Sequence, residues 1–234
     1  MTRPPKERVL LDGAAGKIEC VIDLPAGSEP RDSVRDAARG SDYDATRGSD
    51  YDAARGVALI AHPHPLFGGS LDNKVVQTMA KTFVELGYVA LRPNFRGVGQ
   101  STGEHDEGRG ETEDLLAVLD YVHLRFGAAA PVLAGFSFGA YVQTVVARRV
   151  TPERMALVGV ASGFVSGGRS YTAEPVPANS IVIHGELDET VPLANVLAWA
   201  RPQDLPIVVV PGADHFFHRR LHIIKNIIKG SWQR

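Results

Sequence analysis

Ser137 lies at the centre of a G-F-S-F-G motif, residues 135–139. An apolar run over residues 132–134 precedes the motif, and a helical apolar run over residues 140–146 follows it. A strand, a sharp turn and a helix in this order form the setting in which a G-x-S-x-G motif presents a nucleophilic serine. The backbone of the serine is strained in such a turn, and the flanking glycines let the helix pack closely against the strand. Free N–H groups at the start of the helix stabilise negative charge that develops beside the serine. We therefore expect a nucleophile rather than an ordinary turn serine.

A nucleophilic serine needs a base, and the base needs an acid that orients it. His215 follows a turn after the last predicted strand, and we expect it to open the final helix. Asp188 lies in the loop after a strand predicted at residues 181–184. All three groups then fall at the carboxyl ends of strands, where open α/β sheets place their sites. The spacing predicts a triad of Ser137, His215 and Asp188.

Three other acids could compete for the orienting role. Glu186 and Glu189 lie in the same loop as Asp188, where Glu189 could equally act as a cap. Asp214 is adjacent to His215, and adjacent residues rarely face each other in triad geometry. We expect a turn or capping role for Asp214 and retain Asp188 as the acid.

Histidines also occur in two groups that could be considered for a metal. No cysteine and no H-E-x-x-H motif accompanies them, so we expect no metal. The G-x-G within residues 96–99 lacks the rest of a dinucleotide fingerprint, and no cofactor is expected. Arg96 could contact substrate or bridge two loops. The histidine groups are His62 with His64, and His215 with His218 and His222.

These candidate residues need a framework that positions them, and the hydropathy pattern predicts alternating strands and helices. The later strands are short, β-branched and apolar on both faces, as in a parallel sheet covered on both sides. Two early strands followed by strand–helix alternation predict an α/β sheet with an antiparallel start. Strands are expected at residues 7–11, 18–24, 57–61, 89–92, 132–134, 157–161, 181–184 and 207–210. Apolar residues at helical spacing over 115–122 predict a helix whose start is marked by the acids Glu111, Glu113 and Asp114. Further helices are expected at residues 73–86, 138–149, 193–200 and 216–229.

Several segments together carry a resemblance to a known family. On these segments the chain resembles the α/β-hydrolase superfamily, specifically its small, lidless, dienelactone-hydrolase-like bacterial serine hydrolases. The order serine, aspartate, histidine agrees with that superfamily. Dienelactone hydrolase itself is less similar, because its nucleophile is a cysteine where this chain has Ser137. Besides G-F-S-F-G, the segments are H-P-H-P-L-F-G-G-S at 62–70, N-F-R-G-V-G-Q-S at 94–101, H-G-E-L-D-E-T-V-P at 184–192 and P-G-A-D-H-F-F at 211–217.

The resemblance implies a mostly parallel central sheet of about eight strands, with helices on both faces and no cap domain. It also implies a serine esterase without a cofactor, in which two backbone N–H groups form an oxyanion hole. Phe138, directly after the nucleophile, is expected to supply one of them. The family usually has H-G-x where this chain has H-P-H-P-L, so the second donor is the amide of His64, which is slightly favoured, or of Leu66. The prolines have no N–H to donate.

The overall composition excludes several classes of protein. Among 234 residues, 25 Lys and Arg stand against 27 Asp and Glu, which argues against nucleic-acid or membrane-surface binding. No apolar run approaches the roughly 20 residues of a membrane-spanning helix, and the polar N-terminus lacks the core of a signal peptide. The single cysteine, Cys20, excludes an intramolecular disulfide and fits a reducing compartment. We expect a cytoplasmic protein, monomeric or homodimeric, that acts on a small-molecule ester.

A tandem repeat stands apart from the rest of the chain. The octad D-A-A-R-G-S-D-Y begins at Asp36, recurs with one change at Asp44 and starts again at Asp52. It contains almost no large aliphatic side chain and therefore supplies no buried face. We expect one domain over residues 1–234, in which residues 25–56 form a flexible surface loop. A binding arm rich in tyrosine and arginine is the alternative.

Residues 162–180, where larger relatives insert a lid, are short and rich in glycine and proline. This segment predicts an open site and the hydrolysis of small or short-acyl carboxylic esters through an acyl-enzyme. The same triad could serve a thioesterase, an acyltransferase or a peptidase. A non-catalytic binding protein of this fold, or a scaffold that binds through the repeat, is the alternative from a different class.

Overall fold

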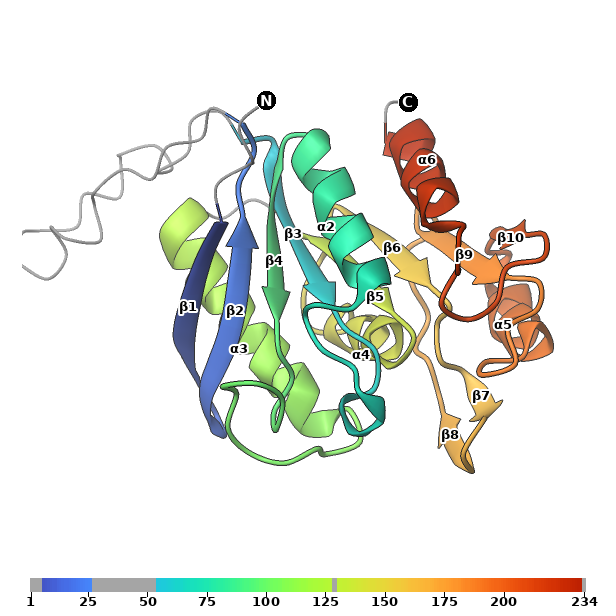
Figure 1. Ribbon diagram of the computed structural model, residues 1–234, viewed down its shortest axis with the longest axis horizontal. Coiled ribbons are helices and arrows are strands. Elements are labelled where there is room, and N and C mark those ends of the chain that lie inside the picture. The colour runs from blue at the N-terminus through green and yellow to red at the C-terminus, as the bar shows by residue number, and fades with distance from the viewer. Residues whose placement is uncertain (1–5, 27–53, 128–129, 233–234) are drawn as a thin grey trace, which may run out of the picture.

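An eight-stranded sheet forms the centre of the structure, a computed structural model that describes residues 6–26, 54–127 and 130–232 (Figure 1). The strand order is β1-β2-β4-β3-β5-β6-β9-β10. The pairs β1–β2 and β2–β4 are antiparallel and the other five pairs are parallel. The strands are β1 (Lys6–Gly13), β2 (Gly16–Asp23), β3 (Gly56–Ala61), β4 (Tyr88–Pro93), β5 (Val132–Phe136), β6 (Arg154–Val158), β9 (Ile181–Gly185) and β10 (Ile207–Val210).

Helices cover both faces of this sheet (Figure 1). One apolar cluster contains side chains of α2 and α6, including Met79 and Ile224. The other contains side chains of α3, α4 and α5, including Leu115, Val142 and Val196. The central strands are buried on both faces, which explains their continuous apolar sequences. The helices are α2 (Lys74–Glu85), α3 (Arg109–Phe126), α4 (Phe138–Val146), α5 (Leu193–Ala200) and α6 (Leu221–Trp232), with 3-10 turns η1 (Pro65–Phe67) and η2 (Arg201–Gln203).

Two predicted boundaries were wrong for identifiable backbone reasons. The strand expected at residues 157–161 is β6, which ends at Val158, because Gly159 turns out of the sheet with a φ of 54°. The helix expected from residue 216 begins at Leu221 instead, so His215 lies in a turn and does not open the helix. Phe217 and Arg219 have φ values of 51° and 60°, and such left-handed residues cannot extend a helix.

The segment between β6 and β9 carries a short hairpin that the sequence did not predict. Its strands are β7 (Gly163–Val165) and β8 (Arg169–Tyr171). The Arg169 guanidinium lies 4.2 Å from the ring centre of Phe67 in η1, and the Tyr171 ring lies 5.7 Å from that of Phe138. The hairpin therefore packs along the loops at the carboxyl ends of the parallel strands.

The octad repeat lies outside the described residues except for its end, residues 54–56, of which Gly56 begins β3. It falls between β2 and β3, and the prediction of a surface loop at residues 25–56 is not tested there. Within the described ranges, no helix combines the length and the apolar character needed to cross a lipid bilayer.

The close approach of α4 to β3 generates a first prediction, for Gly139→Ala. A Cβ at Gly139 would lie 2.4 Å from the His62 carbonyl oxygen and 2.5 Å from that of Ala61, both backbone atoms that cannot rotate away. We expect the variant to lose about 3 kcal/mol of unfolding free energy, as overpacked cores do. Urea denaturation followed by circular dichroism measures the loss.

Gly230→Ala provides the matched control, since Gly230 lies in α6 and a Cβ there meets no atom within 4 Å. The control should be unchanged or stabilised by up to about 1 kcal/mol, because alanine has the higher helix propensity. Equal stabilities for the two variants would contradict the close packing at Gly139.

Candidate active site

Ser137 occupies a strained turn between β5 and α4. Its φ of 56° and ψ of −119° place a non-glycine residue in a sparsely populated backbone region. The Ser137 N–H donates to the Val158 carbonyl at 2.9 Å, which ties the turn to the end of β6. A Cβ at Gly135 would lie 2.7 Å from backbone atoms of Gly139 and Ala140. Glycine is needed at position 135 because the helix starts directly against the strand that leads to the serine.

The structure brings the three residues of the predicted triad into one hydrogen-bonded chain. His215 Nε2 lies 3.0 Å from Ser137 Oγ, and His215 Nδ1 lies 2.7 Å from Asp188 Oδ2. The residues come from the loops after β5, β9 and β10, which meet at the carboxyl edge of the parallel strands. Because the Nδ1–H of His215 donates a hydrogen bond to Asp188, the Nε2 lone pair faces the serine hydroxyl. This geometry allows the imidazole to take a proton from Ser137.

Asp188 is held in place by its own loop. Its second oxygen, Oδ1, accepts the N–H groups of Thr190 at 2.9 Å and Val191 at 2.7 Å. The side chain is buried, with 6% of the residue exposed. These bonds fix the orientation of the carboxylate and leave Oδ2 directed at His215.

Two of the competing acids have other partners, and the third is exposed. Glu186 accepts the N–H of Gly212 at 2.7 Å, and Glu189 is exposed. Asp214 accepts the backbone N–H of His218 at 3.0 Å and lies 2.6 Å from His218 Nδ1. Asp214 thus stabilises the turn after β10 and does not contact the imidazole of the adjacent histidine.

A second histidine, His184, lies behind the acid and was not identified from the sequence. Its Nε2–H donates to the Val191 carbonyl at 2.9 Å, and the same nitrogen lies 3.6 Å from Asp188 Oδ2. Burial lowers the pKa of His184, so the ring packs beside the carboxylate as a neutral group. Its position in the H-G-E-L-D segment was the available signal, since it lies at the end of the strand that precedes the acid, one residue before the last residue, Gly185.

The two amides considered on the loop after β3 differ in their partners. The Leu66 N–H donates to Nδ1 of His64 at 3.2 Å, so it is already engaged. The backbone N–H groups of His64 and of Phe138 have no hydrogen-bond partner among the residues that the structure describes. Of the two loop candidates, His64 is therefore the one with an available donor.

His62 supports this loop from inside the protein. Its Nε2 accepts the Phe95 N–H at 2.9 Å, so the proton resides on Nδ1, which donates to the Pro63 carbonyl at 2.6 Å. The ring is completely buried. Burial lowers the pKa of His62 to about 4, and the imidazole is neutral at neutral pH.

The ring of His64 lies between aromatic side chains beside the nucleophile turn. Its centre is 4.9 Å from that of Phe138 and 4.5 Å from that of His105. His105 Nδ1 donates to Glu111 Oε1 at 2.7 Å, and Glu111, fully buried, also accepts the Gly108 N–H at 2.8 Å. Burial, His105 and Arg169 together lower the pKa of His64 to about 4. The sequence identified Glu111 only as an acid at a helix start and missed its contact with His105.

Arg96 and the remaining histidines do not contribute to this arrangement. Arg96 donates to both carboxylate oxygens of Asp114, at 2.8 and 2.9 Å, and to the Gly110 carbonyl at 2.8 Å. It therefore bridges two segments, the second of the roles considered for it. Across the described ranges, no group of three or more His, Cys, Asp and Glu side chains is arranged to hold a metal ion.

Comparison with known proteins gives this geometry a family. A profile of the alpha/beta hydrolase fold matches residues 64–165. A lidless α/β serine hydrolase from Xanthomonas campestris is 31% identical, with a TM-score of 0.80, and the similarity covers 98% of this chain and 94% of the relative. The chain belongs to the α/β-hydrolase superfamily. The predicted fold, a mostly parallel sheet with helices on both faces, is confirmed, and the described residues form no cap domain.

Two further relatives agree with the assignment to small α/β-hydrolases. An α/β serine hydrolase homologue from Coxiella burnetii is 37% identical, has a TM-score of 0.73 and is matched over 95% of both chains. An uncharacterized protein of Rickettsia prowazekii is 36% identical over 171 residues, which are 69% of this chain and 71% of the relative. The family supports hydrolase chemistry acting on a small-molecule substrate.

The buried state of His62 predicts a contribution to acid instability. Because its pKa is lower in the folded protein than in the unfolded chain, the unfolded chain binds the proton first as the pH falls. The stabilisation from the neutral ring is complete above the unfolded pKa and is lost as the pH falls towards about 4. Between about pH 7 and about pH 5, His62 should account for about 2 kcal/mol of lost unfolding free energy.

Urea unfolding of the wild type and of His62→Gln at both pH values measures this term. The variant, whatever its absolute stability, should lose about 2 kcal/mol less over that interval. An NMR titration of the His62 ring in the wild type gives a second readout that does not depend on the variant. A ring that titrates near its usual pKa would contradict the buried, neutral state.

Proposed function

We propose that this protein hydrolyses small or short-acyl carboxylic esters through an acyl-enzyme intermediate. The observation that carries the proposal is the continuous hydrogen-bonded chain from Ser137 Oγ through His215 to Asp188. A serine, an imidazole and a carboxylate in this order can generate an alkoxide nucleophile without a cofactor.

In the first half-reaction, Ser137 Oγ attacks the ester carbonyl carbon and its proton passes to His215 Nε2. Asp188 accepts the hydrogen bond from the Nδ1–H of His215, which stays on the ring, and stabilises the imidazolium that forms. The oxyanion is stabilised by the amides of Phe138 and His64, each worth roughly 3 kcal/mol in enzymes of this kind. Collapse of the tetrahedral intermediate transfers the Nε2 proton to the departing alcohol and leaves Ser137 acylated.

In the second half-reaction, a water molecule takes the place of the alcohol. His215 removes its proton while the hydroxyl oxygen attacks the acyl carbon, and the proton then returns to Ser137 as the acid is released. The fixed Asp188 carboxylate serves both halves, because its two backbone bonds do not change as the imidazole gains and loses its proton.

Small substrates are favoured by what surrounds the serine. Between β6 and β9 the chain inserts only the β7–β8 hairpin. At one side, the rings of Tyr171, Tyr141 and Phe138 pack together, and the ring centres of Tyr171 and Tyr141 are 4.9 Å apart. A short acyl group fits such a bounded surface better than a long chain, which would extend into solvent.

Labelling with a fluorophosphonate probe tests the nucleophile. The folded wild type should be labelled at Ser137 and should hydrolyse para-nitrophenyl acetate. Ser137→Ala should lose the label and at least about 10³-fold in kcat. Asp188→Asn should lose about 10⁴-fold in kcat, since the imidazole is then held in the wrong tautomer.

Asp214→Asn is the control for these variants, because Asp214 adjoins His215 in sequence but bonds to His218. It should retain activity close to that of the wild type. Absence of labelling of the folded wild type would contradict the esterase proposal. A series of para-nitrophenyl esters of increasing acyl length tests the substrate size, and a preference for long chains would contradict the short-acyl assignment alone.

The second oxyanion donor is tested by a pair of substitutions at His64. With a φ of −52° and a ψ of 124°, His64 already has the backbone angles of a proline that precedes another proline. His64→Pro therefore removes the N–H with little backbone change, whereas His64→Ala removes the same ring and keeps the N–H. We expect kcat to be about 10²- to 10³-fold lower in the proline variant than in the alanine variant. Equal rates would show that another group is the donor.

A further inference from the structure

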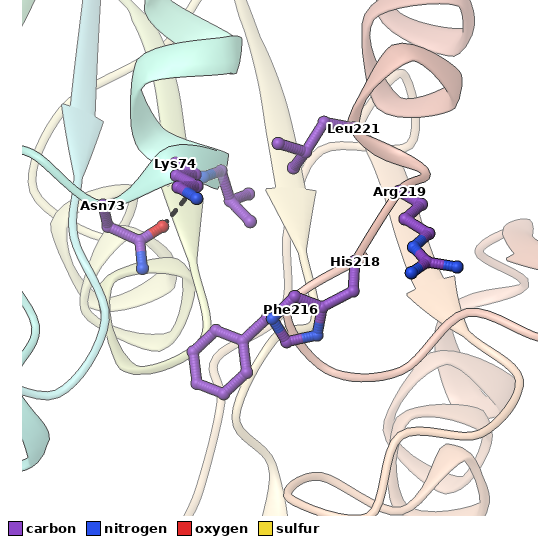
Figure 2. A pocket seen from close by; sticks show the side chains of 7 residues that line it. Asn73, Lys74, Phe216, His218, Arg219 and Leu221 are labelled. Atoms are coloured by element: carbon purple, nitrogen blue, oxygen red, sulfur yellow. Dashed lines mark hydrogen bonds between the residues drawn. The ribbon is translucent and has the colours of Figure 1, made fainter.

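A pocket of about 290 Å³ opens beside the triad, between the start of α2 and the turn that leads into α6 (Figure 2). Its apolar walls are the side chains of Val75, Phe216 and Leu221. Lys74 lines it at the start of α2, and Arg219 lines it at the rim, from the turn that leads into α6 (Figure 2). Neither the triad nor the oxyanion amides use this pocket.

Phe216 joins the pocket to the catalytic histidine. Its ring centre lies 5.1 Å from that of His215 and 6.0 Å from that of Phe136, the residue before the nucleophile. Phe216 is 46% exposed although it adjoins a buried site. The pocket is therefore separated from the imidazole by one aromatic side chain.

The position of the pocket relative to His215 indicates which part of an ester would enter the pocket. The carbonyl oxygen must face the amides of Phe138 and His64, whereas the departing oxygen must receive a proton from His215 Nε2. Groups attached to the departing oxygen are thus on the imidazole side. The pocket beside Phe216 suits the alcohol portion of the substrate.

The charged groups of the pocket are unbalanced. Lys74 and Arg219 are exposed and form no ion pair within the part of the chain that the structure describes. The third ionisable side chain, His218, lies 2.6 Å from the Asp214 carboxylate, so this pair brings no net positive charge. Asp72, two residues before Lys74 in sequence, does not line the pocket and lies 3.8 Å from the Arg92 guanidinium.

Backbone donors at the start of α2 do not add to these cations. The Asn73 side chain accepts the N–H of Val75 at 2.9 Å and that of Val76 at 3.4 Å, so these two first-turn amides are already capped. An anion in the pocket would be held by the two flexible side chains at its rim, and its apolar carrier by Phe216 and Leu221.

We infer that the pocket selects esters whose alcohol portion is a short apolar or aromatic group bearing an anionic substituent, such as a carboxylate. The inference rests on the proposed esterase function and adds a substrate class to it. Apolar walls bind the body of the alcohol, and Lys74 and Arg219 bind its charge. Discrimination between a charged and a neutral alcohol then depends on the two cations.

Two acetate esters with leaving groups of nearly the same shape test this. The alcohol is meta-carboxyphenol in one and meta-carbamoylphenol in the other. The readout is the kcat/KM of the carboxylated ester divided by that of the carbamoyl ester. Comparing this ratio between wild type and variants cancels the intrinsic reactivity of the two esters. Lys74→Gln and Arg219→Gln should each lower the ratio by about threefold to fivefold, as expected for exposed ion pairs.

Lys81→Gln is the matched control, because Lys81 is an exposed lysine further along α2 that does not line the pocket. It should leave the ratio unchanged. Raising the salt concentration to about 0.5 M should lower the wild-type ratio and leave that of the double variant nearly constant. A second pair, the para-nitrophenyl esters of succinate and butyrate, carries the charge difference on the acyl side, and neither pocket variant should alter its ratio.

The outcomes separate the two proposals. If the wild type is not labelled by fluorophosphonate and cleaves neither acetate, the esterase function itself fails. If it cleaves both, but the first ratio is the same in wild type, Lys74→Gln and Arg219→Gln, the anion-selecting pocket is overturned and the esterase function stands. A change confined to the acyl-side pair would overturn the assignment of the pocket to the alcohol.

Discussion

The backbone of Ser137 adopts angles that only a tightly packed environment maintains, and the rest of the site is built around that turn. A conformation of this kind costs about 1–3 kcal/mol. It is held by the hydrogen bond from the Ser137 N–H to Val158 and by the packing of α4 against β3 at Gly139. Because the turn joins a buried strand to a buried helix, the serine hydroxyl is presented at a fixed point at the edge of the sheet.

The two apolar layers determine where the partners of the serine arrive. The layer containing α2 and α6 and the layer containing α3, α4 and α5 cover opposite faces, so the loops after β5, β9 and β10 are left at one edge. Neutral, buried histidines then line the inside of that edge. His62 and His184 each donate to a backbone carbonyl, which orders the loops without placing an additional charge beside the triad.

Much of this arrangement could be predicted from local sequence. The apolar runs and the glycines at 135 and 139 determine a strand, a turn and a helix within a few residues, and Ser137, Asp188 and His215 each follow a strand. The incorrect or missing predictions concern features that are determined by contacts between residues far apart in the sequence. The left-handed residues Phe217 and Arg219, which delay α6, and the pairing of His105 with Glu111 leave no periodic pattern in the sequence.

The choice between His64 and Leu66 is a further example of what local sequence leaves open. Both registers of the H-P-H-P-L segment can be matched to the family pattern, and the sequence favours His64 only slightly. Only the side chain of His64, which bonds to the Leu66 amide, distinguishes them, and its orientation depends on the surrounding rings of Phe138 and His105. Which amide remains free to donate depends on packing between three separate loops, so it cannot be inferred from the sequence of any one of them.

The contact between Gly139 and the His62 carbonyl has a bearing on how such a protein could acquire new substrates. It joins the nucleophile turn to the loop after β3 through main-chain atoms alone, so no side-chain substitution can adjust the gap between them. The geometry of the part of the site that would bind the reacting carbonyl is therefore determined by the main-chain packing of the fold. Changes in substrate preference are then left to the exposed side chains around it, such as Phe67, Lys74 and Phe216. These can be substituted without altering the main-chain contact between the nucleophile turn and the loop after β3.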